Sequence, residues 1–140
     1  ASMDTSVTSG SNMAYGVSYT LAVEGVGVTA GVGKSDVGTA SQTSMGVSAT
    51  MAGLSATLIH SADDNGTAAD VDETALSVSY SMAAITATVF QKDVATTGAV
   101  DTNYQGVGIA YDLGGATAKL GVMRDDADLQ TIDAGISFSF

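Results

Sequence analysis

Residues 131–140 read TIDAGISFSF, and apolar and polar residues alternate along this stretch. Ile132, Ala134, Ile136 and Phe138 share one parity, whereas the residues between them are polar or glycine. Side chains of a β-strand point alternately to the two faces of a sheet. The alternation therefore predicts a strand with one apolar face and one polar face.

The same alternation recurs along the chain at intervals of 30 or 31 residues. Four segments superpose: GVSYTLAV from Gly16, GVSATMAG from Gly46, SVSYSMAA from Ser77 and GIAYDLGG from Gly108. Each contains a short connection of small residues, which is typical of a β-hairpin. The repeat predicts nine antiparallel strands, at about residues 12–20, 25–34, 44–51, 53–60, 75–82, 84–92, 104–112, 115–124 and 131–140.

Short and long connections alternate between these strands. The short ones fall at residues 21–24, 51–53, 82–84 and 113–115, and the long polar ones at 35–43, 61–74, 93–103 and 125–130. This order places all the long loops at one end of the sheet.

Composition limits what can cover the apolar face. Of 140 residues 45% are hydrophobic, but there are 17 Gly, only 3 Phe and 5 Tyr, and no Trp, Pro or Cys. Two packed sheets would need bulkier inward residues to reach the density of a protein interior. No apolar run approaches the roughly 20 residues of a membrane helix, whereas a membrane strand needs only about 9–11. The pattern predicts an all-β fold, a transmembrane antiparallel up-and-down β-barrel forming a single domain over residues 1–140; a soluble sandwich is the alternative.

Charge is placed as a membrane barrel requires. The net charge is −11 at pH 7 and only four residues are basic, which argues against a nucleic-acid partner because phosphate binding needs clustered Lys and Arg. Nearly all the acidic residues lie in the predicted loops. None lies in mid-strand on the apolar face, where a charge in lipid would cost a few kcal/mol.

Aromatic residues recur on the apolar face near the short connections, namely Tyr19, Tyr80, Tyr111 and Phe138. Aromatic rings favour the boundary between apolar and wet regions, so this placement predicts an aromatic girdle at a membrane interface. Ordinary cross-strand aromatic contacts are the alternative.

The C-terminal residues carry a resemblance to a known family. AYDLGGATAKLGV at residues 110–122, a short acidic loop and IDAGISFSF at 132–140 resemble the end of a Gram-negative general porin of the alphaproteobacterial type. The resemblance implies an outer-membrane barrel of about 16 strands. It further implies a channel for passive diffusion of small hydrophilic solutes and ions, and a homotrimer in contact with the lipid bilayer and lipopolysaccharide. Ile136, Phe138 and Phe140 would form the signal read by the barrel-assembly machinery.

The predicted strand count departs from that family. Nine is odd, whereas bacterial single-chain barrels have even counts. The first predicted strand also runs toward a short connection, which places residues 1–11 on the long-loop, external side. We therefore expect the C-terminal part of a larger barrel, with residues 1–11 as the remnant of an external loop and Ala1 not as the natural start.

Candidate pore-lining residues have the parity of the polar face: Lys119, Lys92, Thr117, Asp133 and Ser137. A lysine in the lumen would attract anions, and a structural pairing with a carboxylate is the open alternative. Lys34 and Arg124 have the parity of the apolar face at strand ends, where long side chains reach lipid head groups or solvent.

The acidic run SADDNGTAADVDE at residues 61–73 suggests a weak divalent site for loop-bound calcium, because hard cations favour carboxylate oxygens. Its ligands would be Asp63, Asp64, Asp70, Asp72 and Glu73. The spacing of an EF-hand is absent, and a solvated acidic loop is the favoured alternative. No other cofactor is expected.

The sequence does not predict an enzyme, because the single histidine, His60, has no nucleophile and acid at a recognisable spacing. Two functions remain beside the channel: a structural or translocator barrel without general solute flux, and a soluble repetitive β adhesin.

Overall fold

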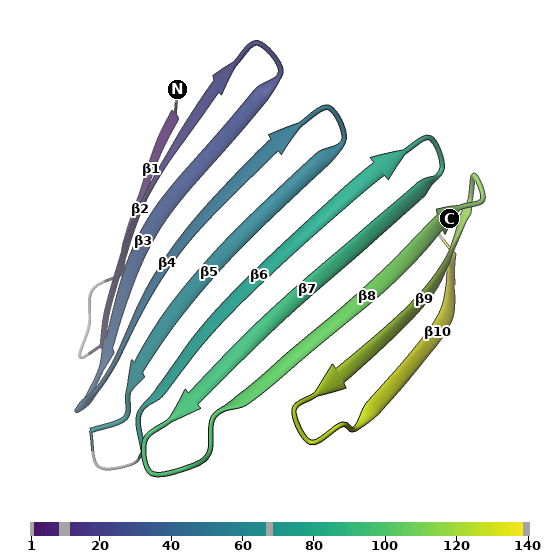
Figure 1. Cartoon of the computed structure of the whole chain (residues 1–140). Coiled ribbons are helices and arrows are strands. Elements are labelled where there is room, and N and C mark those ends of the chain that lie inside the picture. Colours follow the sequence, from purple (N-terminus) through teal and green to yellow (C-terminus); the bar gives the residue numbers. More distant parts are fainter. Residues whose placement is uncertain (1, 9–11, 67–68, 139–140) are drawn as a thin grey trace.

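The protein is one antiparallel sheet in which every strand pairs with the next along the chain (Figure 1). The computed structural model describes residues 2–8, 12–66 and 69–138. Ten strands lie in these ranges: β1 (Ser2–Thr8), β2 (Asn12–Val23), β3 (Val26–Val37), β4 (Ala40–Met51), β5 (Leu54–Asp64), β6 (Val71–Met82), β7 (Ile85–Thr96), β8 (Thr102–Asp112), β9 (Ala116–Asp125) and β10 (Gln130–Phe138).

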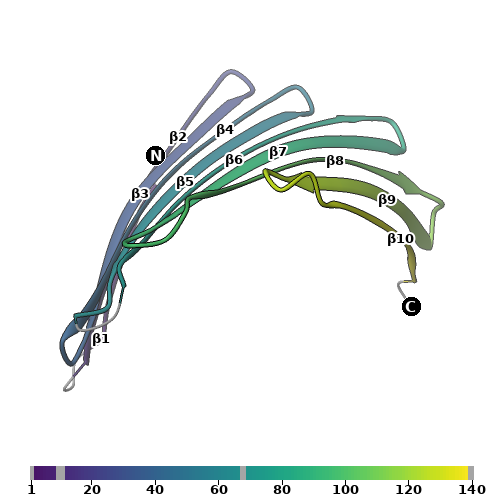
Figure 2. The same ribbon diagram turned by 60° about the horizontal axis from the view of Figure 1, so that its bottom comes forward.

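The sheet is strongly curved and open. Figure 2 shows it as a vault, with β1 and β10 at opposite ends and therefore not paired with each other. The β2–β3, β4–β5, β6–β7 and β8–β9 connections lie at one end of the strands, the short-connection end. The β3–β4, β5–β6, β7–β8 and β9–β10 connections lie at the other, the long-loop end, although β3–β4 is itself a short turn (Figure 1). Across the described residues, the structure contains no helix long and apolar enough to cross a membrane.

All nine predicted strands are present, but the prediction for residues 1–11 is wrong in part. Residues 2–8 form β1 rather than an external loop, and Ser2 pairs with Thr20, near the short-connection end. The sequence SMDTSVT has only Met3 and Val7 as large apolar residues, so it shows little alternation. Its strand forms because the edge of β2 offers unpaired backbone groups. With β1, the described residues form ten strands, which is an even number.

The strands also run further into the polar segments than predicted. β3 continues to Val37 and β4 begins at Ala40, so the predicted loop 35–43 shortens to a turn at residues 38–39. The other long loops shorten to residues 65–70, 97–101 and 126–129. Backbone pairing does not depend on apolar side chains, so the strands extend beyond the apolar part of the sheet.

Two of the short connections are tight turns that fit the twist of the strands. Glu24 and Gly25 have φ of 45° and 82°, and Ala52 and Gly53 have φ of 47° and 83°. Two successive positive φ values are typical of type I′ turns, whose twist matches that of the flanking strands.

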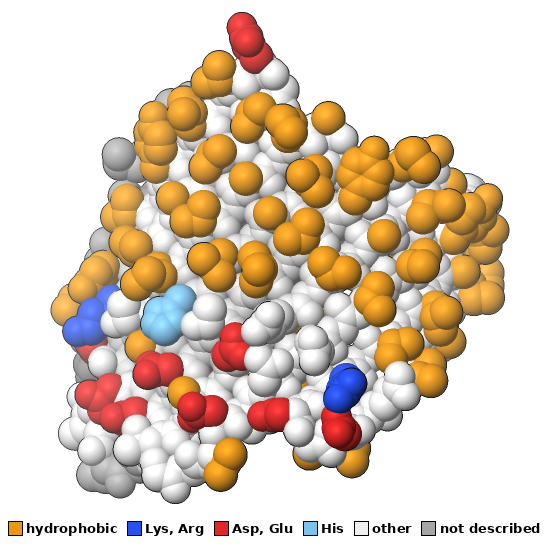
Figure 3. Space-filling view, viewed as in Figure 1, with side chains coloured by type: hydrophobic (Ala, Val, Ile, Leu, Met, Phe, Trp, Pro, Cys, Tyr) orange, Lys and Arg blue, Asp and Glu red, His pale blue; other side chains and the backbone are white. Residues whose placement is uncertain are grey.

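The convex face is apolar over most of its area, apart from the end with the longer loops (Figure 3). Large apolar side chains are exposed there, and Val47 in the middle of β4 is 48% exposed. No side chain of the residues described is buried as part of a hydrophobic core. The sheet therefore leaves its apolar face uncovered, and the described residues form no hydrophobic core that would stabilise it.

The large apolar residues of the convex face form a band, here called the apolar band. This band runs at an angle to the rows of residues that pair directly with one another from strand to strand. One row of directly paired residues is apolar across β2 to β6 and polar across β7 to β10. It runs Tyr19, Ala30, Val47, Leu58, Leu76, Gln91, Gln105, Arg124 and Gln130. Strands of a barrel are tilted and staggered, so a level band on the outside must cross such rows obliquely.

Candidate functional site

The five candidate pore-lining residues all lie on the concave face. Thr117 lies opposite Ser137 and Lys119 opposite Gly135 between β9 and β10, and Asp133 lies opposite Gly121. Lys92 of β7 pairs with Ala75 of β6. Each has the parity opposite to that of the apolar band, so strand alternation brings them to one wall.

Lys92 is held by a neighbouring carboxylate. Its Nζ lies 3.0 Å from Oε1 of Glu73 on β6, and both side chains are 39% exposed. An ion pair in contact with solvent contributes little to stability. The pair places one positive and one negative charge on the concave wall toward the long-loop end of the strands.

Lys119 lies further along the wall toward the short connections. No carboxylate in the described part of the chain lies within 4.0 Å of its Nζ, the limit for an ion pair. Asp133 is its diagonal neighbour across the β9–β10 pair, which puts the two Cα atoms about 7–8 Å apart. Lys119 and Asp133 therefore place a positive and a negative charge close together on the concave wall without forming a direct ion pair.

Hydroxyl groups line the concave face toward the short connections. Thr20 bonds Thr29 at 2.9 Å between their Oγ1 atoms, and Ser79 Oγ bonds Thr88 Oγ1 at 2.8 Å. These residues face each other directly in the register. Each hydroxyl keeps a further acceptor site for water, so the wall is a hydrated surface.

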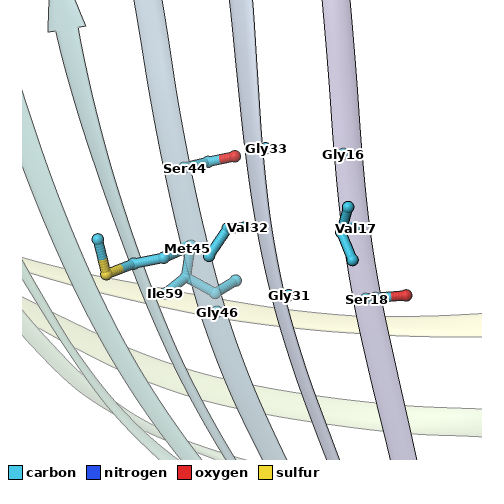
Figure 4. A pocket seen from close by; sticks show the side chains of 10 residues that line it. All are labelled: Gly16, Val17, Ser18, Gly31, Val32, Gly33, Ser44, Met45, Gly46 and Ile59. Carbon is cyan, nitrogen blue, oxygen red and sulfur yellow. The ribbon is translucent and has the colours of Figure 1, made fainter. Parts of the chain in front are cut away.

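Glycines hollow out part of the concave wall over β2 to β5. Figure 4 shows this hollow of about 410 Å³, in which the glycines leave bare backbone between Ser18 and Ser44. Gly16 lies opposite Gly33, and Gly31 lies opposite Gly46. Small residues at these positions widen the space on the concave side.

The aromatic residues of the predicted girdle lie on the convex face. Tyr80 is two residues from the end of β6, Tyr111 is one residue from the end of β8, and Phe138 is the last described residue of β10. Tyr19 departs from the prediction, because β2 continues for four residues beyond it to Val23. Of the proposed assembly signal, Ile136 and Phe138 lie on the convex face, and Phe140 lies outside the described residues.

Charged and polar side chains form a band on the convex face at the long-loop end (Figure 3). Lys34 Nζ lies 3.3 Å from Asp36 Oδ1, and Arg124 forms an ion pair with Asp128. His60, which sequence reasoning left without a role, bonds Thr74 on the next strand, at 2.9 Å between Nδ1 and Oγ1.

The acidic residues of the predicted calcium site are divided between the two faces. Asp63 and Glu73 have the parity of the concave face, whereas Asp64 and Asp72 have that of the convex face. Asp70 lies in the loop, where its Oδ1 accepts a hydrogen bond from Asn65 N at 3.2 Å. Within the described ranges, no three acidic or histidine side chains come close enough to hold a metal ion.

Sequence reasoning missed several large side chains on the concave face, among them Ile59, Phe90 and Met123. Phe90 of β7 and Met123 of β9 lie on either side of Gly106 in one row of the register. The sequence does contain a sign of them, because each is a large apolar residue at a strand position whose parity otherwise belongs to small and polar residues.

Comparison with known proteins gives structural similarity only. No protein-family model matches the sequence, and no curated protein matches it. A solved porin superposes with a TM-score of 0.70 at 21% identity, over 92% of this chain and 52% of the porin. OmpT, an outer-membrane protein of Vibrio cholerae, superposes as a loop L8 deletion mutant with a TM-score of 0.66 at 16% identity, over 91% of this chain and 53% of that one.

These two similarities show the fold. The arrangement of strands is that of about half of an outer-membrane β-barrel, because the chain spans about half the length of these solved structures.

Proposed function

We propose that the chain forms part of the wall of a water-filled β-barrel channel in the outer membrane of a Gram-negative bacterium. The channel passes small hydrophilic solutes and ions by passive diffusion, as a general porin does, and no enzymatic role is proposed. The observation that carries the proposal is the contrast between the faces: an uncovered apolar convex face, and a hydrated concave face with hydroxyl groups and charges.

The convex face indicates that an apolar medium covers the sheet. Exposed large apolar residues spread over a whole face need an apolar phase to cover them. The oblique course of the apolar band fits tilted strands in a lipid layer. A second protein sheet would cover a face in the same way, but the described residues provide none.

The open edges of the sheet indicate that further strands complete a closed barrel. The outer edges of β1 and β10 carry backbone N–H and C=O groups that the sheet itself does not pair, and such groups cost several kcal/mol each in lipid. Further strands between β10 and β1 would pair both edges and close the barrel. The fit to about half of a porin supports a ring of about the size of a porin barrel.

The partners follow from the same surface. We expect lipid on most of the convex face, and lipopolysaccharide beside Lys34 and Arg124 at the rim. A homotrimer would cover part of the apolar face between subunits. The barrel-assembly machinery would read the C-terminal strand. Divalent cations would bind weakly at the acidic long-loop end.

Conductance of the full natural chain, refolded in detergent and inserted into planar lipid bilayers, tests the channel. We expect stepwise conductance that rises in proportion to salt concentration. A folded barrel without conductance would leave a structural or translocator barrel. A protein that folds without detergent and stays in the aqueous phase would indicate the soluble adhesin.

A pair of tryptophan variants tests which face lines the water. A Cβ at Gly46 would meet only Leu58 O at 3.6 Å and Ile59 Cγ1 at 3.8 Å, which are ordinary contacts, so the backbone accepts a side chain here and that of Gly46→Trp would project from the concave face. We expect Gly46→Trp to lower the conductance of a single channel and the matched convex-face variant Val47→Trp to leave it unchanged. The opposite order would refute the assignment of the faces.

A further inference from the structure

A second hollow, of about 570 Å³, lies on the concave face over β7 to β10. Its central row is Thr88, Gly108, Gly121 and Asp133, one residue from each of the four strands in direct register. No function described above uses this hollow.

The floor of the hollow is open backbone. A Cβ at Gly108 would meet only Leu120 O at 3.7 Å, and one at Gly121 would meet only Val107 O at 3.8 Å, which are ordinary contacts. No side-chain atom lies within 4 Å of either Cβ position, and the hollow of about 570 Å³ is large enough for a small solute.

One wall of the hollow is apolar and fixed in place. Phe90 and Met123 lie in the next row, on the long-loop side of the glycines, and both are half-buried. The ring of Phe90 covers Gly106, where a Cβ would lie 2.5 Å from Cε1 and 2.8 Å from Val122 O. Gly106 is thus required for the ring to lie where it does. Large apolar side chains on a hydrated wall offer a surface to an apolar group of a solute.

Opposite charges flank the other sides. Asp133 ends the central row, and Lys119 lies one row further toward the short connections. Neither forms an ion pair with a described residue, and Thr131, next to Asp133 on the same face, adds a hydroxyl group. The hollow thus presents a carboxylate and an apolar wall around one open floor, and Lys119 lies one row outside its lining, on the same face as Asp133.

We infer that this hollow binds an amino acid in its zwitterionic form, one with an apolar side chain. The ammonium group of the solute meets Asp133, its carboxylate meets Lys119, and its side chain packs against Phe90 and Met123. Charge complementarity selects a solute that carries both charges, and the apolar wall favours a leucine-like or phenylalanine-like side chain over glycine. The inference rests on the proposed function, because the concave face must be the water-filled side.

Binding of L-phenylalanine to the full natural chain, refolded in detergent, tests the inference by calorimetry or saturation-transfer NMR. For twelve heavy atoms on an open wall, we expect a dissociation constant on the order of a few millimolar. Glycine, phenylethylamine and 3-phenylpropionate each lack one of the three groups and should bind about threefold to tenfold more weakly. Equal binding of any of these three and L-phenylalanine would overturn the inference.

Variants of the hollow locate the binding. Gly121→Leu fills the floor without removing a charge and should abolish detectable binding, whereas Gly46→Leu places the same side chain in the other hollow and should leave it intact. Asp133→Asn and Lys119→Gln should each weaken binding about threefold to tenfold. Their matched controls, Asp36→Asn and Lys34→Gln, change an ion pair on the convex face and should have no effect. Unchanged binding in Gly121→Leu would refute the site.

The two proposals fail in different ways. If the protein conducts ions in bilayers but does not bind L-phenylalanine in detergent, the channel stands and the hollow is only part of its wall. If the protein neither conducts ions nor binds L-phenylalanine, both proposals are refuted.

Discussion

A lysine in place of Val47 would place a charge in the middle of the convex face. On β4 the apolar residues of this face run from Met45 to Met51, so Val47 lies well inside the band. Ser48, the next residue, points to the concave face between Thr29 and Thr57, away from any charge. We expect Val47→Lys to be strongly destabilising and Ser48→Lys to be nearly neutral.

The magnitude follows from exposure and depth. Val47 is 48% exposed on its own chain, so about half of the transfer free energy of a valine side chain, roughly 1 kcal/mol, depends on the surroundings. A lysine near the middle of a bilayer adds roughly 2–4 kcal/mol. The free energy of unfolding should fall by about 3–5 kcal/mol, more than a hundredfold in the folding equilibrium. Ser48→Lys should change it by less than about 1 kcal/mol.

The measurement is a guanidinium titration of the full natural chain folded in phospholipid vesicles, followed by far-ultraviolet circular dichroism. A third variant, Thr43→Lys, lies on the convex face of the same strand but in the row of Lys34 near the strand end. It should cost about 0–1 kcal/mol, because the penalty falls toward the interface. Equal losses for Val47→Lys and Ser48→Lys would refute the lipid-facing assignment, and equal losses at positions 43 and 47 would indicate a protein partner instead.

Two further pairs of variants test the turns and the wall. In a guanidinium titration, Gly53→Ala should lower the free energy of unfolding by more than Gly25→Ala. Both glycines have positive φ, which costs an alanine roughly 1–2 kcal/mol, but only at Gly53 would the added Cβ collide with Ser81 O. Similar losses in the two variants would contradict this contact. Lys92→Gln should make the channel more cation-selective, seen as a shifted reversal potential in a salt gradient, and more so at 0.1 M than at 1 M salt because screening lengths are about 10 Å and 3 Å. Lys34→Gln, on the outer face, should leave the potential unchanged, and a shift there would refute the assignment of Lys92 to the lumen.

The sequence predicted the strands and their faces because alternation at a fixed parity is a local property. Each predicted strand lies within or close to an observed one, and the parity assigned to Val47 or to Asp133 is the parity that the register shows. The aromatic residues of the girdle and the pore-lining candidates fell on their faces for the same reason. Parity survives errors of several residues in strand ends, as long as no residue is inserted into the strand.

Strand length and strand edges could not be predicted in the same way. The continuation of β3 through Ser35 and Asp36 depends on backbone bonds to β4, and polar side chains give no signal for it. Strand β1 depends on pairing with β2, a contact between segments that its own residues do not specify. The oblique course of the apolar band is a property of the register, and a single strand contains no information on its stagger against the next.

Side-chain size connects the curvature of the sheet with its candidate binding site. In a curved sheet the side chains on the concave face converge and those on the convex face spread apart, so small residues such as Gly31, Gly46 and Gly108 relieve crowding on the inner side. Phe90 breaks this rule, and it does so where Gly106 leaves room for its ring. At this position the large residue needs a glycine beside it, and the ring of Phe90 over Gly106 forms one wall of an open hollow. Gly106→Ala would displace the ring and should weaken L-phenylalanine binding even though Gly106 itself need not touch the solute; unchanged binding would show that Phe90 has no part in it.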